Sequence, residues 1–202
     1  MQIKLVVVDI GGVVFTKGKT LFCEYLSKKY SIPLAKVTAV IDGYHAIQYR
    51  CNEITESEYW STVQAGLPEV KLSSRELEQV WFELYGLIDG MYEIILRLRP
   101  HVLVGYLSNN TKERIAYLQN KFGFMEWFDG GVFSYEVGVV KNSNKIYQCL
   151  FEKFPGVRPS EIVVIDDKME NLSLPSSLGV NCVHFTTVSN LKQSLRDLGL
   201  PV

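Results

Sequence analysis

Residues 3–15 read IKLVVVDIGGVVF, and this stretch decides the fold. Residues 3–8 form an apolar run rich in valine, which is typical of a parallel strand buried on both faces. Asp9 ends the run and is followed by the turn residues Gly11 and Gly12. Open α/β sheets bind ligands at the carboxyl ends of their strands. Asp9 is therefore a candidate functional carboxylate, although aspartate before glycine is also a common turn former.

A second apolar run, residues 102–107, ends in Ser108 and Asn109 and precedes an amphipathic helical pattern. Asn110 and Glu113 have the spacing of a capping box, so Asn110 is expected to cap this helix. Ser108 lies before the cap, at the tip of the expected strand. Its hydroxyl and the free N–H groups of the helix start would form a corner that binds anions.

A third apolar run, residues 162–165, ends in the adjacent carboxylates Asp166 and Asp167. Asp167 with Glu170 could form an ordinary helix cap, which would explain one acid but not two. Neighbouring carboxylates repel each other unless a cation lies between them. Oxygen ligands with room for water suit Mg²⁺, so a magnesium site is expected here.

Lys141 follows the segment SYEVGVV. A single lysine is usually a solvated surface residue, so Lys141 is a candidate only together with the other motif residues. The ordered set resembles the four motifs of the haloacid dehalogenase superfamily, the aspartate-nucleophile phosphatases and their relatives. The motifs are DIGGV at 9–13, LSN at 107–109, Lys141, and IDDKMEN at 165–171. Residues 138–141 resemble the lysine segment of the family, although its usual Lys-Pro-Asp-Pro is here KNSN.

This resemblance implies a Rossmann-like parallel sheet flanked by helices, with a helical cap inserted after the first strand. It implies that Asp9 attacks phosphorus to form an aspartyl-phosphate, which water then hydrolyses. The phosphate-binding residues implied are Ser108, Asn109 and Lys141, and the Mg²⁺ ligands implied are Asp9, the carbonyl of Gly11, Asp166 and Asp167.

Gly11 is the one important departure from the family pattern, because phosphatases of the family usually carry a second aspartate there as general acid and base. Loss of a positioned acid costs about 10²–10⁴-fold. The chain could then cleave esters with good leaving groups, such as sugar 1-phosphates, or borrow an acid from the cap, where His45 is the only histidine. The leading analogy is with phosphatases that resemble glucose-1-phosphate phosphatase.

Two other functions stay open at this point. A slow or non-catalytic module that binds a phosphorylated ligand or a protein would tolerate Gly11. A metal-independent 2-haloacid dehalogenase needs no proton for its leaving group, but its fourth motif carries Ser/Asn-type residues, and Asp166 and Asp167 argue against it.

The 202 residues suit one α/β core, expected at 1–15 and 89–202, with a helical cap of the first type at 16–88. Within the cap, Thr55 with Glu58 and Ser73 with Glu76 have capping-box spacing. The aromatic residues expected to form the cap's core are Tyr44, Tyr49, Tyr59, Trp60 and Trp81. Such a cap would exclude water and select the leaving group.

Composition limits the partners. The formal net charge is −1, which gives no electrostatic argument for binding nucleic acid. No apolar run approaches the length of a membrane span, and no signal peptide is recognisable before the first strand. A cytoplasmic location, no membrane partner and a small phosphorylated metabolite as substrate are therefore expected, while the oligomeric state is left open.

Overall fold

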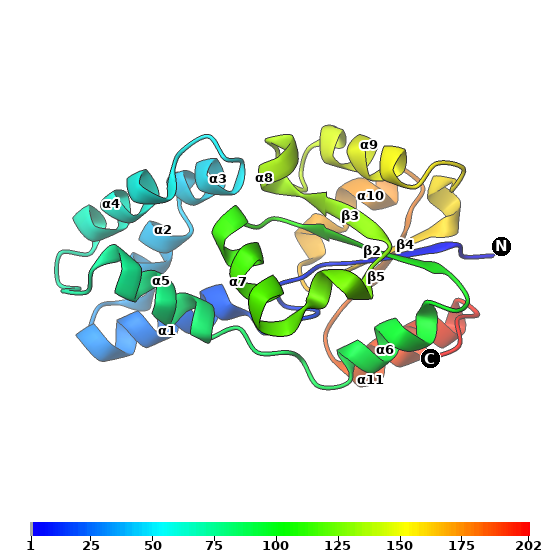
Figure 1. Cartoon of the computed structure of the whole chain (residues 1–202), viewed down its shortest axis with the longest axis horizontal. Helices are drawn as coiled ribbons and strands as arrows, with labels where there is room; N and C mark the ends of the chain where they lie inside the picture. Colours follow the sequence, from blue (N-terminus) through cyan, green and yellow to red (C-terminus); the bar gives the residue numbers. More distant parts are fainter. Residues whose placement is uncertain (1) are drawn as a thin grey trace.

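A computed structural model describes residues 2–202 of the chain. Its centre is a five-stranded sheet in which all pairings are parallel, in the order β3-β2-β1-β4-β5 (Figure 1). The strands are β1 (Leu5–Val8), β2 (Leu103–Ser108), β3 (Gly130–Phe133), β4 (Ile162–Asp166) and β5 (Asn181–His184). The α/β fold class expected from the sequence is confirmed.

The apolar run of β1 is buried on both faces, as its composition predicts. Val6 and Val8 belong to the larger hydrophobic cluster, which continues into the helices α6 and α11. Leu5 and Val7 point to the opposite face and belong to a second cluster, which includes residues of α9. All four side chains are at most 1% exposed. The central strand therefore holds Asp9 in a rigid, dry setting.

Helices cover both faces of the sheet in Figure 1, with α6 and α11 on one side and α9 and α10 on the other. The helices of this part are α6 (Met91–Leu98), α7 (Lys112–Phe122), α8 (Ser134–Val137), α9 (Asn144–Lys153), α10 (Ser173–Ser177) and α11 (Val188–Asp197). Short 3₁₀ helices lie at Phe124–Trp127, Pro159–Glu161 and Met169–Asn171. No helix within residues 2–202 is long and apolar enough to cross a bilayer.

A separate group of helices lies beside the carboxyl end of β1, at the left of Figure 1. Its members are α1 (Gly18–Tyr30), α2 (Leu34–Ile41), α3 (Tyr44–Arg50), α4 (Glu56–Gly66) and α5 (Ser74–Glu83). We call this group the cap. Both expected capping boxes, at the starts of α4 and α5, are confirmed. The division of the chain into a core at 1–15 and 89–202 and a cap at 16–88 stays a prediction.

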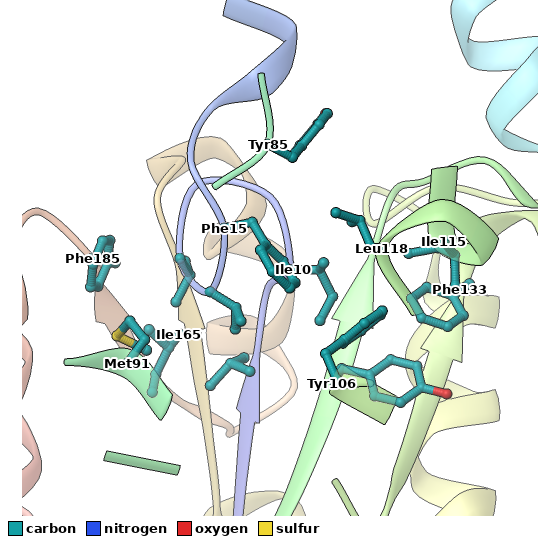
Figure 2. Packing of buried hydrophobic residues seen from close by; sticks show 14 of the residues in the cluster. Ile10, Phe15, Tyr85, Met91, Tyr106, Ile115, Leu118, Phe133, Ile165 and Phe185 are labelled. Atoms are coloured by element: carbon teal, nitrogen blue, oxygen red, sulfur yellow. The ribbon is translucent and has the colours of Figure 1, made fainter. Parts of the chain in front are cut away.

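The two linkers are tied together by backbone pairing. The amide of Thr16 donates to the carbonyl of Gly86 at 2.8 Å, and the amide of Ile88 donates to the carbonyl of Val14 at 2.9 Å. Figure 2 shows Phe15 of the first linker and Tyr85 of the second in one buried cluster with Leu118 of α7. These contacts fix where the cap begins relative to the strand ends.

Stacked aromatic rings fill the interior of the cap. The rings of α1 residue Phe22 and α5 residue Trp81 stack at 5.1 Å between centroids, and the Tyr49 and Tyr59 rings stack at 4.8 Å. Trp60 completes this core, as expected. The expectation for Tyr44 is wrong, because its side chain is 69% exposed at the first position of α3. Aromatic content alone does not tell which face of a short helix is buried.

Candidate active site

The sheet brings the predicted strand ends to one edge. Val8 of β1 lies level with Tyr106 of β2 and with Ile165 of β4. The residues that follow in each strand therefore meet at the same edge, and the amide of Asp9 donates to the carbonyl of Ile165 at 2.9 Å. Parallel pairing with β1 at the centre puts Asp9 beside the end of β4, where Asp166 lies.

Lys141 joins this edge from the loop after α8. Its Nζ lies 2.9 Å from Oδ1 of Asp9 and 2.6 Å from Oδ2 of Asp166, and the side chain is 2% exposed. Its backbone amide donates to Oδ1 of Asn109 at 3.0 Å, which fixes the loop against the end of β2. Although burial lowers the pKa of Lys141, the carboxylates of Asp9 and Asp166 outweigh it and raise that pKa. A buried cation thus holds two carboxylates together.

Burial raises the pKa of Asp9 to about 6, and the charge of Asp166 adds to the rise while Lys141 opposes it. The backbone amide of Ile10 donates to Oδ1 of Asp9 at 2.8 Å and fixes the rotation of this carboxyl group. A second cation near Asp9 would favour its ionised form. The environment of Asp9 is therefore one that a bound metal ion would complete.

Asp166 and Asp167 differ sharply in their partners. Both oxygens of Asp166 accept from Nδ2 of Asn171, at 3.0 and 3.1 Å, and Oδ1 also accepts from the amide of Lys168 at 2.9 Å. Asp167 has one ion pair, from Oδ2 to Nζ of Lys17 at 2.8 Å. Its Oδ1 is buried and has no hydrogen-bond partner among the described residues. Asp167 caps no helix, since the following 3₁₀ turn begins after Lys168.

A metal ion fits this arrangement. Asp9, Asp166 and Asp167 each offer an oxygen, and the three oxygens lie within 4.8 Å of one another. The unpartnered Oδ1 of Asp167 is an acceptor that a cation would satisfy. Gly12 makes the close approach possible, because its φ is +94° and an added Cβ would lie 2.5 Å from the carboxyl carbon of Asp167. Carboxylate oxygens of this kind suit Mg²⁺.

The end of β2 corrects one expectation. Ser108 is buried at the strand end, but the helix that follows is capped by Thr111, whose hydroxyl accepts from the amide of Arg114. Asn110 is therefore not the cap. Its Oδ1 accepts from the amide of Thr111 at 3.0 Å and from Nη1 of Arg114 at 3.1 Å. The capping-box spacing failed here because two adjacent residues, Asn110 and Thr111, could both serve as a cap.

Gly11 could carry a side chain. It adopts no positive φ, and an added Cβ would meet only Cε1 of Tyr85, at an ordinary 3.8 Å. The missing second aspartate therefore reflects the choice of residue and not a steric limit. His45 is exposed on α3 and is not among the residues that line the cavity at this edge, so it is no candidate for a substitute acid.

The cavity beside the strand ends has a volume of about 210 Å³. Ser108, Asn109 and Asp167 line it, as do Gly11 and Asn171. Its lining also includes residues that the sequence did not predict as site residues: Lys17, Lys19, Arg50, Tyr85, Arg114 and Lys168. Of these missed residues, only Lys168 lay in a recognised motif. The other cations carry no local signal, because an isolated lysine or arginine is usually solvated.

The sequence matches the profile of the family described as haloacid dehalogenase-like hydrolase over residues 3–174. The chain belongs to this family. The resemblance noted in the motifs is confirmed. The finer subgroup, with phosphatases that resemble glucose-1-phosphate phosphatase, stays a prediction.

An uncharacterised protein of Dictyostelium discoideum is 25% identical over 149 residues, which are 71% of this chain and 64% of that protein. The chain therefore spans less than two thirds of the length of this relative. Among solved structures, the family enzyme BT-2542 of Bacteroides thetaiotaomicron, in complex with magnesium and inorganic phosphate, is 20% identical, with a TM-score of 0.74. That match covers 94% of this chain and 98% of the other.

The hydrolase YfnB of Bacillus subtilis, bound to magnesium, is 15% identical, with a TM-score of 0.71 over 99% of this chain and 100% of that one. At such low identity, likeness to BT-2542 and YfnB establishes the shared fold alone. The magnesium in these neighbours belongs to them.

Proposed function

We propose that this chain is a Mg²⁺-dependent phosphatase that hydrolyses a small phosphorylated metabolite resembling a sugar phosphate. The observation that carries the proposal is the cluster of Asp9, Asp166 and Asp167, whose oxygens lie within 4.8 Å of one another. Three carboxylates face one buried lysine, Lys141, and one exposed lysine, Lys17, so the cluster is still short of positive charge. A divalent cation and a phosphate ester together would complete this balance.

The reaction begins at Asp9, whose carboxylate attacks phosphorus, displaces the alcohol and forms an aspartyl-phosphate that water hydrolyses. Lys141 and Ser108 bind the phosphoryl oxygens and stabilise the charge of the transition state. When bound, Mg²⁺ shields the negative charge of the phosphate and orients it. Asp9, the carbonyl of Gly11 and Asp167 would hold the ion, while Asp166 orients Lys141 and contributes charge.

Asn109 acts through Lys141 in this proposal, since its side-chain oxygen accepts from the Lys141 amide. It also lines the cavity beside Ser108, where a phosphoryl oxygen would bind. Because Gly11 provides no acid, the departing oxygen must leave with little help from a proton. Sugar 1-phosphates depart through their anomeric oxygen, which is a better leaving group than a simple alkoxide, and therefore suit the site better than simple alkyl phosphates.

The test is release of phosphate from glucose 1-phosphate and from 4-nitrophenyl phosphate, with Mg²⁺ and with a chelator. Turnover is expected only with the metal. Asp9→Asn keeps the size of the side chain and should lower kcat/KM by more than about 10⁴-fold. Asp89→Asn is the matched control, because Asp89 is exposed and lies outside the cavity.

Gly11 favours one second candidate, a module that binds a phosphorylated ligand without turning it over. Binding of glucose 1-phosphate with no turnover of any ester in the presence of Mg²⁺ would support that candidate against the phosphatase. Release of chloride from 2-chloropropionate without metal would instead indicate a dehalogenase. The proposed phosphatase predicts neither result.

A further inference from the structure

Besides Lys17, which pairs with Asp167, the active-site cavity is lined by four cations from four different segments. Lys19 comes from α1, Arg50 from α3, Arg114 from α7, and Lys168 from the loop after β4. We call these residues the outer cations. They are separate from Lys141, which is engaged with Asp9 and Asp166. The phosphate-binding corner at Ser108 lines the same cavity.

The outer cations have too little negative charge around them. Lys19 and Arg50 share one carboxylate, since both pair with Asp42, Arg50 at 2.6 Å. Within residues 2–202, neither Arg114 nor Lys168 forms an ion pair. Burial lowers the pKa of Lys19, and the charges of Arg50 and Lys168 lower it further, against the pull of Asp42. Apart from the pair of Lys17 with Asp167, one carboxylate, Asp42, thus balances the four outer cations.

Arg114 is the most telling member, because it is only 3% exposed. Its guanidinium carbon lies 4.1 Å from the centre of the Trp81 ring, and Nη1 donates to the neutral Oδ1 of Asn110. Its Nε is buried and has no hydrogen-bond partner in the described part of the chain. A buried charge without a carboxylate or a full set of acceptors is costly. An anion in the cavity would satisfy it.

We propose that the outer cations bind a second anionic group of the substrate, so that the enzyme prefers phosphate monoesters that also carry a carboxylate or a second phosphate. This inference rests on the proposed phosphatase function and deepens it by naming the substrate class. Arginine suits this role because its planar guanidinium can donate two parallel hydrogen bonds to a carboxylate or a phosphate. Arg50 belongs to the cap and Arg114 to the core. The second anionic group of a substrate, bound by both arginines, would therefore link the cap to the core.

The test compares three substrates that lose phosphate from the same anomeric position: glucose 1-phosphate, glucuronic acid 1-phosphate and glucose 1,6-bisphosphate. The second and third differ from the first by one added anionic group far from the bond that breaks. The wild-type enzyme with Mg²⁺ should hydrolyse both with a kcat/KM roughly 10-fold or more above that of glucose 1-phosphate, chiefly through a lower KM. Equal kcat/KM values for all three, with turnover intact, would overturn the inference and leave the phosphatase standing.

Arg114→Met keeps an unbranched stem against Trp81 and removes the charge. It should lower the preference for the doubly anionic substrates, measured as a ratio of kcat/KM values, by about 10-fold. Lys168→Met should lower it by less, and it should fold, since Lys168 is exposed. Lys112→Met is the control, because it removes an exposed charge from the same helix α7 outside the cavity and should leave the ratio unchanged. If Arg114→Met lowers kcat/KM equally on all three substrates, the role of Arg114 is structural only.

Binding to the Asp9→Asn variant provides a readout that needs no turnover. Calorimetry should give a Kd for glucuronic acid 1-phosphate roughly 10-fold below that for glucose 1-phosphate. Adding Arg114→Met to this variant should remove the difference. If no phosphate ester turns over but this difference is found, the proposed function fails while the second anion site stands; no difference in Kd would overturn the site.

Discussion

The core and the cap both place charged side chains in or beside one cavity, but they hold them in different ways. Asp9 and Asp166 lie at the ends of paired strands, so the backbone of the sheet fixes their positions. Arg50 of the cap is held by a single carboxylate, Asp42. For the proposed function, the difference teaches that the chemical step depends on strand geometry, whereas selectivity for the rest of the substrate depends on side-chain packing.

This comparison predicts opposite consequences for substitutions in the two regions. A change at the strand ends should alter catalysis with little loss of stability, because the sheet is held by its backbone and by apolar packing on both faces. A change in the buried polar groups of the cap should alter stability and leave the chemical step alone.

Among the three variants that test this comparison, Asp167→Asn should impair catalysis the most. It removes the carboxylate with the unpartnered buried oxygen, so the Mg²⁺ concentration for half-maximal activity should rise by more than about 10-fold, with a large loss of kcat. Without metal, the melting temperature should stay the same or rise, because one of three clustered negative charges is gone. Activity titrations with Mg²⁺ and thermal melts in a chelator measure the two effects. Glu170→Gln, which changes an exposed acid three residues away, is the control. If the melting temperature of Asp167→Asn falls along with its activity, the expected separation between catalysis at the strand ends and stability is wrong.

Gly11→Asp should have the next largest effect. The backbone permits a side chain there, and its Cβ would contact Tyr85 at 3.8 Å. A positioned acid should raise kcat/KM on alkyl phosphates such as glycerol phosphate by roughly 10²-fold, and much less on 4-nitrophenyl phosphate, whose leaving group needs no proton. Gly11→Asn has nearly the same shape without the acid. An equal gain in both variants would show that proton transfer is not what the site lacks.

Glu78→Gln tests the cap and should have the smallest effect. Burial, with the nearby charge of Glu56, raises the pKa of Glu78 from 4.5 to about 7. The folded protein therefore binds this proton more tightly than the unfolded chain, so its contribution to stability is present below about pH 4.5 and lost as the pH rises towards 7. Removing the charge should raise the free energy of unfolding at pH 8 by about 1 kcal/mol, after allowance for solvent screening, and should change it less at pH 5.

Urea unfolding at the two pH values measures this effect, and kcat/KM should stay unchanged. Glu83→Gln is the control, since Glu83 is exposed at the end of the same helix α5. Because Asp9 also has a raised pKa, the wild type loses stability with rising pH at more than one group, and only the difference between the variants reports on Glu78. A fall in kcat/KM in Glu78→Gln would contradict the expectation that buried polar groups of the cap affect stability and leave the chemical step alone.

Much of the fold could be predicted because its signals are local. The valine-rich run before Asp9 could only be a strand buried on both faces, and Thr55 and Ser73 begin their helices with capping boxes. The helix after Ser108 was misjudged by one residue, since both Asn110 and Thr111 are good caps and only the backbone decides between them. Strand β3 gave no sequence signal strong enough to predict it, because it is four residues long and half glycine.

The sequence by itself determined the family, the parallel sheet and the order of the motif residues along the chain, because apolar periodicity and short motifs reflect local backbone structure. Only the tertiary structure decided that Asp166 is saturated with donors while Asp167 keeps a free oxygen, and that Arg50 and Arg114 face one cavity. The reason is physical: these properties arise where segments far apart in the chain converge, and the convergence is set by packing that no single segment encodes.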